Sequence, residues 1–464
     1  MLTQLTHLLS IINNFIWGLP AVILLVGTGA FLTFYLGFIQ IRAFPHAFAV
    51  ICGKYTKKKT PGEISHFRAL MTGLSGTIGT GNIAGVATAI AMGGPGAVFW
   101  IWMSALFGMA SKFCASMLAV KYREISPDGE VSGGPMYTIL RGLKMPKLAM
   151  AFAVFTVIAS FGIGNTVQAN SVIDGLNFIV PSSATYNGFI GILLAFLVGI
   201  VIIGGIKRIG HLTAIIVPIM AIFYIGAALI VLALNFTAIP HAFHLIFEYA
   251  FNPHALGGGM VALAIKYGSA RGIFSNEAGL GSTAIVHAAA KTNEPVREGL
   301  VAMLEPFFDT LIICTLTALV LLVTNTLQPH MLSTQDSTAI SQQAFAQGLQ
   351  PLGRYADEIG SWIVGIGIIF FAYSSMISWS YYGNRACLFA FGPRSLFFYR
   401  LFFTVAIFFG AVAPLRFVWQ FADLANILMA APNLISLWLL APTIKAMTKD
   451  YFKRMRTRAS ASTL

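Results

Sequence analysis

Long apolar runs, separated by short clusters of charged and turn-forming residues, divide almost the whole chain. A run of about 20 apolar residues is long enough to cross the hydrocarbon core of a membrane as a helix. The pattern predicts an all-α integral membrane protein with about eleven transmembrane helices. We expect them at residues 15–40, 67–92, 95–122, 147–172, 187–206, 211–235, 257–290, 302–325, 359–389, 398–416 and 421–446.

The composition narrows the class of protein. Hydrophobic residues make up 57% of the 464 positions and charged residues only 10%, whereas an ordinary soluble domain carries about a quarter charged residues. This excludes a soluble globular domain and a disordered chain, and the length leaves no room for a large domain outside the membrane. The net charge of +13 does not indicate nucleic-acid binding, because the basic residues lie in short loops rather than on a polar module.

The distribution of Lys and Arg predicts the orientation. If the eleven helices alternate across the membrane, 24 of these residues lie at one set of helix ends, and only Arg354 and Arg416 lie at the other. Because cytoplasmic loops collect basic residues, we expect the amino terminus outside and the basic tail in the cytoplasm of a multi-pass protein of the inner (plasma) membrane. The remaining cations lie within predicted spans: Lys112, Lys266 and Arg271.

Two of the predicted helices contain glycine-rich interruptions, at residues 73–85 and 272–281. Five helices can be counted from each interrupted helix, and an odd number reverses the direction of the second set relative to the first. We therefore expect a 5+5 inverted repeat with one extra helix in front. The extra helix with a basic cytoplasmic loop would occupy residues 1–66. The two repeats would occupy residues 67–236 and 257–447, and a basic cytoplasmic tail residues 448–464.

Broken helices at matching positions of two halves are the best sequence indicator of a transporter binding site. A broken helix persists in lipid only where it is buried or binds a ligand. Its free amides suit a carboxylate, and its free carbonyls suit Na⁺. The segment 76–82, Gly-Thr-Ile-Gly-Thr-Gly-Asn, is the candidate site, and close helix packing is the alternative role of its glycines.

Polar side chains within predicted spans are functional candidates by default. Glu277 lies in the second interruption beside Asn276. It is expected to face the substrate or an ion, or else to pair with Arg271 or Lys266. Gln168 can both donate and accept hydrogen bonds, as an amino-acid headgroup requires, and holding helices together is its alternative role.

The ninth predicted helix carries adjacent hydroxyls at Ser374 and Ser375. Neutral oxygens of this kind suit Na⁺, although serines in spans also bond to their own helix. Trp379 follows one turn later and is expected to wall the pocket or to pack. Structural roles are favoured for three other polar residues in spans: Asp309, Asp423 and Asn433.

Other classes of function fit the sequence less well. The glycines of residues 79–85 lie within one long apolar segment, whereas a dinucleotide-binding turn follows a strand. A membrane hydrolase would need a nucleophile or a metal cluster, but the sequence has no His-Glu-x-x-His and its nine histidines are scattered. A channel would need a continuous polar pore. We therefore expect no enzyme activity and no cofactor.

Several motifs resemble the signature of the alanine or glycine:cation symporter family, the sodium:alanine symporters. They lie at residues 76–89, 94–100, 204–210, 271–282 and 308–315, and the similarity extends from about residue 65 to residue 450. The resemblance implies a leucine-transporter-type fold of five plus five inverted helices. It also implies uptake of alanine, glycine and related small amino acids together with Na⁺, sometimes H⁺, across the lipid bilayer.

The resemblance also assigns roles to residues. The amides of Thr80 and Gly81 would receive the substrate carboxylate. One Na⁺ site would be formed by the carbonyls of Ser75 and Ile78 with the hydroxyls of Ser374 and Ser375, and a possible second site by Thr77 and Asn82. The rest of the substrate site would be lined by Gln168, Asn276, Glu277, Gly279 and Trp379. The chain departs from the family at Asn384, where an acid is common, and this leaves any cytoplasmic gate pair without its acid.

The sequence thus predicts a Na⁺-coupled importer of small neutral amino acids that works by alternating access. Two alternatives remain open. Protons acting through Glu277 would replace Na⁺ as the coupling ion, or the same fold would carry a different small zwitterionic solute.

Overall fold

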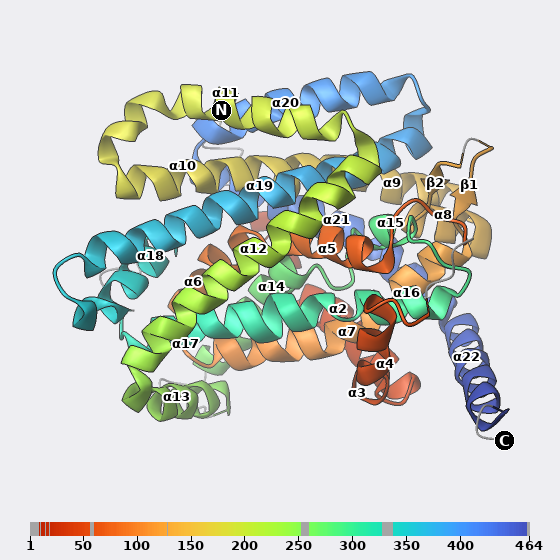
Figure 1. Ribbon diagram of the computed structural model, residues 1–464, viewed down its shortest axis with the longest axis horizontal. Helices are drawn as coiled ribbons and strands as arrows, with labels where there is room; N and C mark the ends of the chain where they lie inside the picture. The colour runs from red at the N-terminus through yellow and green to blue at the C-terminus, as the bar shows by residue number, and fades with distance from the viewer. Residues whose placement is uncertain are drawn as a thin grey trace.

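The computed structural model is a bundle of helices packed around a buried centre (Figure 1). It describes residues 19–55, 60–127, 129–251, 259–326 and 337–461, together with residues 9, 11–13 and 15–17. The first half contains α2 (Leu19–Tyr35), α3 (Ile39–Arg42), α4 (Phe44–Ile51), α5 (His66–Thr77), η1 (Thr80–Asn82), α6 (Ala84–Gly93), α7 (Ala97–Lys121), α8 (Pro135–Tyr137), η2 (Thr138–Leu143), α9 (Pro146–Phe161), η3 (Gly162–Thr166), α10 (Val167–Ile179), η4 (Pro181–Tyr186), α11 (Asn187–Ile202) and α12 (Gly205–Leu234).

The second half is also helical. It contains η5 (Phe236–Ala238), α13 (Ile239–Phe251), α14 (Gly259–Asn276), α15 (Ala284–His287), α16 (Pro295–Ala302), η6 (Phe307–Cys314), α17 (Thr315–Val323), α18 (Ser337–Gly348), η8 (Gln350–Leu352), α19 (Ala356–Phe391), α20 (Ser395–Val412), α21 (Leu415–Leu439) and α22 (Ala441–Ala461). A short antiparallel hairpin follows α7. Its strands are β1 (Glu124–Ile125) and β2 (Val131–Ser132), with Glu124 opposite Ser132.

Each of the eleven predicted segments overlaps a helix. Eight helical segments of the described chain are long and apolar enough to cross a membrane, namely 97–121, 146–179, 181–202, 205–234, 295–323, 356–391, 395–412 and 417–439. The other three predicted segments coincide with shorter or broken helices: α2, the α5–η1–α6 segment, and α14 with α15. The number of membrane crossings and the repeat layout remain predictions. Two predicted spans begin partly outside the described residues. These are the span 15–40, at residue 18, and the span 257–290, at residues 257 and 258.

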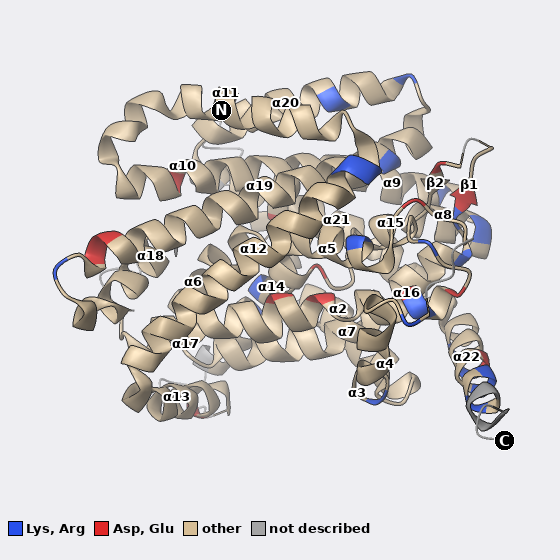
Figure 2. Ribbon diagram, in the orientation of Figure 1, with Lys and Arg blue, Asp and Glu red and all other residues tan. Residues whose placement is uncertain are grey.

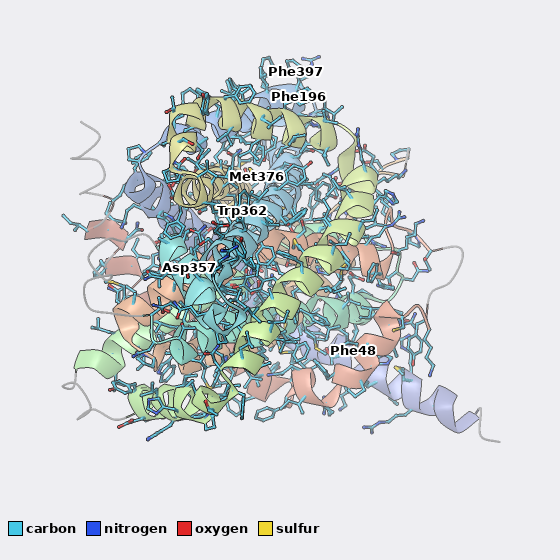
Figure 3. All side chains as sticks on the ribbon, turned by 60° about the vertical axis from the view of Figure 1, so that its left-hand side comes forward. Phe48, Phe196, Asp357, Trp362, Met376 and Phe397 are labelled. Carbon is cyan, nitrogen blue, oxygen red and sulfur yellow. The ribbon has the colours of Figure 1, made fainter. Side chains whose placement is uncertain are left out.

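Apolar side chains cover the outside of the bundle as well as its centre. Figure 3 shows Phe196 on α11 and Phe397 on α20 at the edge of the molecule, whereas Met376 on α19 lies inside. Phe196 and Phe397 are 62% and 69% exposed, and Met376 is fully buried. Water disfavours such a surface, but lipid does not, so the exposed phenylalanines support a membrane environment.

Charged residues lie mostly at one end of the bundle. Figure 2 shows Lys and Arg gathered towards the right-hand side, around β1, β2, α9 and α22, while the long central stretches of the helices carry few charges. The helices α7, α10, α11, α14 and α20 run from side to side in Figure 1, so this end is one rim of the apolar bundle. The same asymmetry underlies the predicted orientation of the chain.

Three helical segments are wound more widely than an α-helix. The segments η2, η3 and η6 are π-helical, with one extra residue accommodated per turn, a feature that is frequent at functional sites. The sequence did not predict them. It also missed α13 and α18, which lie between predicted spans, and extended the last span to residue 446, where α21 ends at Leu439 and α22 begins at Ala441.

Candidate functional site

The first helix break lies at the end of α5. Ile78 and Gly79 have extended backbones, η1 forms a single tight turn, and α6 then begins at Ala84. The side chain of Asn82 accepts a hydrogen bond from the Gly79 amide at 2.9 Å. The interruption expected from the glycines is therefore present, and every residue from Gly73 to Ala87 is buried.

One free amide of this break meets a side chain from α10. The Thr80 amide donates to Oε1 of Gln168 at 3.3 Å, and Nε2 of Gln168 donates to the Ile163 carbonyl at 2.9 Å. A Cβ at Gly79 would lie 3.2 Å from Gln168, so the glycine allows the two elements to approach closely. The hydroxyl of Thr80 is buried and has no hydrogen-bond partner among the described residues. Gln168 and Thr80, two of the predicted substrate-site residues, thus lie together, and their role in binding stays a prediction.

A buried carboxylate stands on the other side of the break. Nδ2 of Asn82 donates to Oδ1 of Asp309 at 2.7 Å and to its carbonyl at 3.0 Å. Oδ2 of Asp309 accepts from the hydroxyls of Ser275 and Thr310 at 2.8 and 2.6 Å. All three donors are neutral, and among the described residues this fully buried acid is held by hydrogen bonds rather than by an ion pair. Thr77 donates instead to the Leu74 carbonyl at 3.3 Å.

Oxygen atoms of α5 and α19 lie against each other. The hydroxyl of Ser75 donates to the Ser374 carbonyl at 2.6 Å, and the hydroxyl of Ser375 donates to the Gly76 carbonyl at 3.1 Å. Ser378 donates to the hydroxyl of Ser75 at 2.9 Å, whereas the Ser374 hydroxyl bonds back to its own helix at Phe371. The bond of a serine to its own helix therefore occurs at Ser374, whereas Ser375 bonds across to α5. The Na⁺ role of the two hydroxyls stays a prediction.

The second break turns at residues with left-handed backbones. Glu277 has φ 54°, and Gly279 and Gly281 have φ 84° and 82°. A left-handed Glu is uncommon and strained. The Asn276 side chain caps the turn by accepting from the Ala278 amide at 3.0 Å, and Asn433 donates to the Gly279 carbonyl at 2.8 Å. These contacts hold the turn that the glycines predicted.

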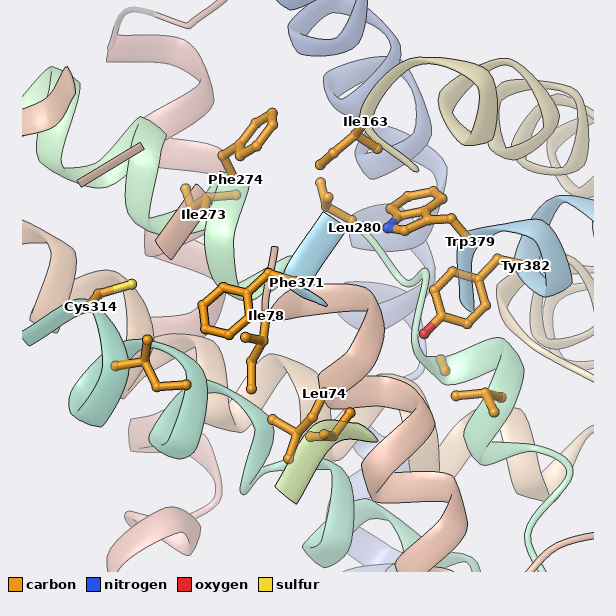
Figure 4. Close-up of a cluster of buried hydrophobic side chains, with 14 of the residues drawn as sticks. Leu74, Ile78, Ile163, Ile273, Phe274, Leu280, Cys314, Phe371, Trp379 and Tyr382 are labelled. Atoms are coloured by element: carbon orange, nitrogen blue, oxygen red, sulfur yellow. The ribbon is translucent and has the colours of Figure 1, made fainter. Parts of the chain in front are cut away.

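The Glu277 side chain reaches across to α19. Its Oε1 accepts from Nε1 of Trp379 at 2.8 Å, and its Oε2 accepts from the Ser282 hydroxyl. Figure 4 shows the Trp379 nitrogen directed toward the segment that carries Leu280. A Cβ at Gly164 would lie 2.2 Å from Trp379, so this glycine of η3 makes room for the indole.

The expected pairing of Glu277 with Arg271 or Lys266 is wrong. Arg271 instead pairs with Asp423, with Nη2 2.7 Å from Oδ2, and Lys266 lies over the ring of Tyr267 at 5.4 Å. The reason is the helix break, since the α-helix ends at Asn276 and the left-handed turn at Glu277 brings its side chain to Trp379 of α19. The structural roles favoured for Asp423 and Asn433 agree with their contacts.

A chain of buried ionisable side chains continues from this region. Lys112 donates to Glu305 at 2.7 Å, and His287 lies between Glu305 and Glu298, with each ring nitrogen 2.6 Å from a carboxylate oxygen. Glu298 also contacts His66. Because ionised carboxylates only accept hydrogen bonds, His287 satisfies both by carrying both ring protons. These positive and negative charges compensate each other where water does not reach.

Sequence reasoning missed this chain of side chains, and the hydrogen bonds of Asp309 agree with the structural role favoured for it. One signal was available, because Glu298 and Glu305 are seven residues apart and so fall on one helical face. The partner His287 lies in the second broken segment, and nothing local in the sequence points it toward Glu298 and Glu305.

Apolar side chains from the breaks and from α19 form a buried cluster in the same region (Figure 4). They include Ile78, Phe274, Leu280, Phe371 and Trp379.

Comparison with known proteins decides the family. A model described as the sodium:alanine symporter family matches residues 2–463. The chain belongs to this family. It is 46% identical over 450 residues to the sodium/alanine symporter AgcS of Methanococcus maripaludis, which covers 96% of both chains. It is 35% identical over 457 residues to the putative sodium/proton-dependent alanine carrier protein YrbD of Bacillus subtilis, covering 96% of this chain and 92% of the relative.

A solved structure shares the fold. MhsT in complex with L-phenylalanine aligns with a TM-score of 0.56 at 13% identity, covering 84% of this chain and 99% of that one. At this identity the likeness speaks for the fold alone, and it supports the predicted leucine-transporter type. Family and fold together make this chain a multi-pass membrane protein and a cation-coupled amino-acid symporter, not an enzyme.

Proposed function

We propose that this symporter imports small neutral amino acids, alanine or glycine, driven by Na⁺ entry. It would act by alternating access in the plasma membrane, with the amino terminus outside and the basic tail in the cytoplasm. The observation that carries the proposal is the broken α5–η1–α6 segment, whose Thr80 amide bonds to Gln168 at 3.3 Å. An amide already paired with a movable side-chain oxygen can exchange that partner for a carboxylate oxygen.

The substrate would bind through its two charged groups. Its carboxylate would take the amides of Thr80 and Gly81, and Gln168 would then turn its oxygen toward the ammonium group. The second break would complete the site through Asn276, Glu277 and Gly279, with Trp379 as a wall. Glu277 already accepts two hydrogen bonds, so its role in this scheme is to fix Trp379 and the turn and to add negative charge near the ammonium.

Close packing around the first break favours a small substrate. A Cβ at Gly79 would lie 3.2 Å from Gln168, and one at Gly81 would lie 3.2 Å from Phe274. Side chains of one or two carbons fit such surroundings more easily than a branched chain. Each methylene of difference is worth about 1–3 kcal/mol in a tight pocket.

The ion would bind to oxygen atoms beside the breaks. One candidate set comprises Ser75, Ile78, Ser374 and Ser375, where α5 meets α19. The other is Thr77 with Asn82, to which we add the carboxylate of Asp309 because it lies 2.7 Å from Asn82. An acid whose described partners are neutral can accept either Na⁺ or a proton, so the second set bears directly on the choice of coupling ion.

Uptake of radiolabelled alanine into proteoliposomes tests the proposal. A Na⁺ gradient should drive uptake without a pH gradient, and glycine should compete whereas leucine should not. One Na⁺ entering down 100 mV contributes about 2.3 kcal/mol from voltage alone. Uptake driven by a pH gradient and indifferent to Na⁺ would reject Na⁺ coupling, and an absence of alanine uptake under either gradient would reject the substrate.

Asp309→Asn separates the ion site from the substrate site. We expect the Na⁺ concentration for half-maximal uptake to rise by about tenfold or more, because a carboxylate ligand is lost, while alanine binding at saturating Na⁺ is retained. Asp357→Asn is the matched control, since Asp357 is exposed at the start of α19. If Asp309→Asn leaves Na⁺ dependence unchanged but abolishes pH dependence, the proton alternative is favoured.

A further inference from the structure

A basic groove lies where α22 meets the end of α2. Its volume is about 800 Å³. Its cationic lining residues are Arg42, Lys445, Lys449, Lys453 and Arg456. The aromatic and apolar ones are Phe34, Tyr35, Leu36 and Phe452, and the small or polar ones are Gly37, Thr448 and Thr457. Among these described residues there is no acid, so the groove attracts an anion.

The groove-lining residues of α22 form one face of the helix. They recur at spacings of three and four residues from Lys445 to Thr457, which places them in a single stripe. The opposite face docks α22 on the protein. There Tyr451 is buried, and its hydroxyl lies 2.7 Å from Nε2 of His46 and 3.2 Å from Nε of Arg297.

The acids near α22 are also turned away from the groove. Arg454 pairs with Glu294 at 2.6 Å and with Asp450 at 2.8 Å. Neither acid lines the groove. The lysines Lys445, Lys449 and Lys453 therefore present their charges to the groove with no carboxylate among its described walls.

The position of the groove selects its partner. α22 follows directly on the apolar helix α21, and in Figure 1 it runs crosswise to the side-to-side helices, at the end of the bundle where Lys and Arg gather in Figure 2. A helix so placed lies along the membrane surface. The other wall is the end of α2, where Phe34 is 64% exposed on the lipid side of an apolar helix. The groove therefore spans the boundary between headgroups and acyl chains.

We propose that this groove binds an anionic phospholipid of the bilayer. Lys445, Lys449, Lys453, Arg456 and Arg42 would surround the phosphate headgroup, since clusters of basic residues beside membrane helices bind acidic lipids.

Phe34 and Phe452 would contact the start of the acyl chains. Lys445 is held over the ring of Tyr35 at 4.2 Å, so one of the cations is already positioned by an aromatic partner. The proposal does not depend on which amino acid is transported.

Native mass spectrometry of the full-length protein in detergent tests the proposal. Phosphatidylglycerol should bind at least tenfold more tightly than phosphatidylcholine of the same chain length. The variant Lys445→Gln/Lys449→Gln/Lys453→Gln should bind phosphatidylglycerol on the order of 100-fold more weakly, at about fivefold for each cation removed. Added salt should weaken binding to the wild-type protein, because the contact is exposed and ionic.

A control variant removes the same charge elsewhere. Lys121→Gln/Lys144→Gln/Lys147→Gln takes three exposed lysines from the same predicted cytoplasmic side and should change phosphatidylglycerol binding less than about threefold. Equal losses in the two variants, or equal binding of the two lipids, would overturn the proposal. Free glycerol phosphate at matched concentration should not displace the lipid. Full displacement would assign the groove to a small soluble anion instead.

Discussion

Gly73 marks the point where α5 meets the buried chain of charges. A Cβ built at Gly73 would lie 1.9 Å from Oε1 of Glu305 and 3.3 Å from Nε2 of His287. The carboxylate cannot move aside freely, because Lys112 holds it at 2.7 Å and His287 holds it at 2.6 Å. The substitution Gly73→Ala therefore forces Glu305 to give up one or both partners.

The size of the effect follows from these contacts. Removing a partner from a buried ion pair costs about 3–5 kcal/mol. Alanine recovers up to about 1 kcal/mol of helix propensity relative to glycine. The net loss expected for Gly73→Ala is therefore about 2–4 kcal/mol in the free energy of unfolding.

The matched control lies in the same broken segment. A Cβ at Gly85 meets no atom within 4 Å, so Gly85→Ala should be neutral or stabilise by up to about 1 kcal/mol. Both variants are measured by reversible unfolding in mixed detergent and denaturing micelles.

A double-mutant cycle identifies the colliding group. Glu305→Gln alone should destabilise the protein, and adding Gly73→Ala to it should cost clearly less than Gly73→Ala costs in the wild type, because the two changes disrupt the same contacts. The reasoning is refuted if Gly73→Ala and Gly85→Ala behave alike, or if the effects of Gly73→Ala and Glu305→Gln are strictly additive.

Three further predictions concern the site and the docking of α22. Trp379→Phe removes the indole donor that lies 2.8 Å from Glu277 and should cost about 1–3 kcal/mol in unfolding free energy, because a buried acceptor loses a partner. Gly164→Ala places a Cβ 2.2 Å from Trp379 and should weaken alanine binding by at least tenfold, as the indole moves and releases Glu277; the measurement is binding of radiolabelled alanine. His46 contacts Tyr451 at 2.7 Å, and burial, followed by the positive charges nearby, lowers the pKa of His46 below its usual value near 6.5. A lowered pKa means that protonation favours the undocked helix, so the docking of α22 is stable above about pH 6.5 and weakens as the pH falls below it. The measurement is a fall in the hydrogen-exchange protection factors of α22, each corrected for the intrinsic exchange rate at that pH.

Each of these predictions has a control. Trp362 is 44% exposed, so Trp362→Phe should change the unfolding free energy by less than about 0.5 kcal/mol. Gly226→Ala adds a Cβ with no atom within 4 Å and should leave alanine binding unchanged. His46→Gln should make the protection factors of α22 independent of pH between 5.5 and 7.5. The same pH dependence in this variant would contradict the role given to His46.

The sequence was most informative where local chemistry decides structure. Glycine clusters predicted both helix breaks, because left-handed and closely approached backbone positions exclude most other residues. Apolar runs predicted where the helices lie. In contrast, the contact of Glu277 with Trp379 joins residues 102 positions apart, and the direction of a side chain within a broken helix depends on packing that no local pattern encodes.

Two helices were missed for a different reason. α18 has the composition Ser-Thr-Ala-Ile-Ser-Gln-Gln-Ala-Phe-Ala-Gln-Gly, which is too polar to be recognised by hydropathy. Its burial comes from neighbours, since Ser341 donates to the Ile83 carbonyl and Gln342 donates to the Gly175 carbonyl. α13 is apolar but only 13 residues long, shorter than the membrane is thick. Hydropathy detects spanning helices and overlooks those that pack across their ends.

The π-helical turns make the site sensitive to length as well as to residue identity. Asp309 lies within η6, and Gln168 follows η3 by two residues. A π-helical turn holds one residue more than an α-helical turn. Deleting a single residue from either wide turn would restore an ordinary helix and redirect the side chains in and next to that turn, while the helix beyond it keeps its face. A relative that lacks one residue at positions 162–166 or 307–314 would therefore have a differently shaped pocket. Such a gap in an alignment would indicate a changed pocket more clearly than many substitutions do.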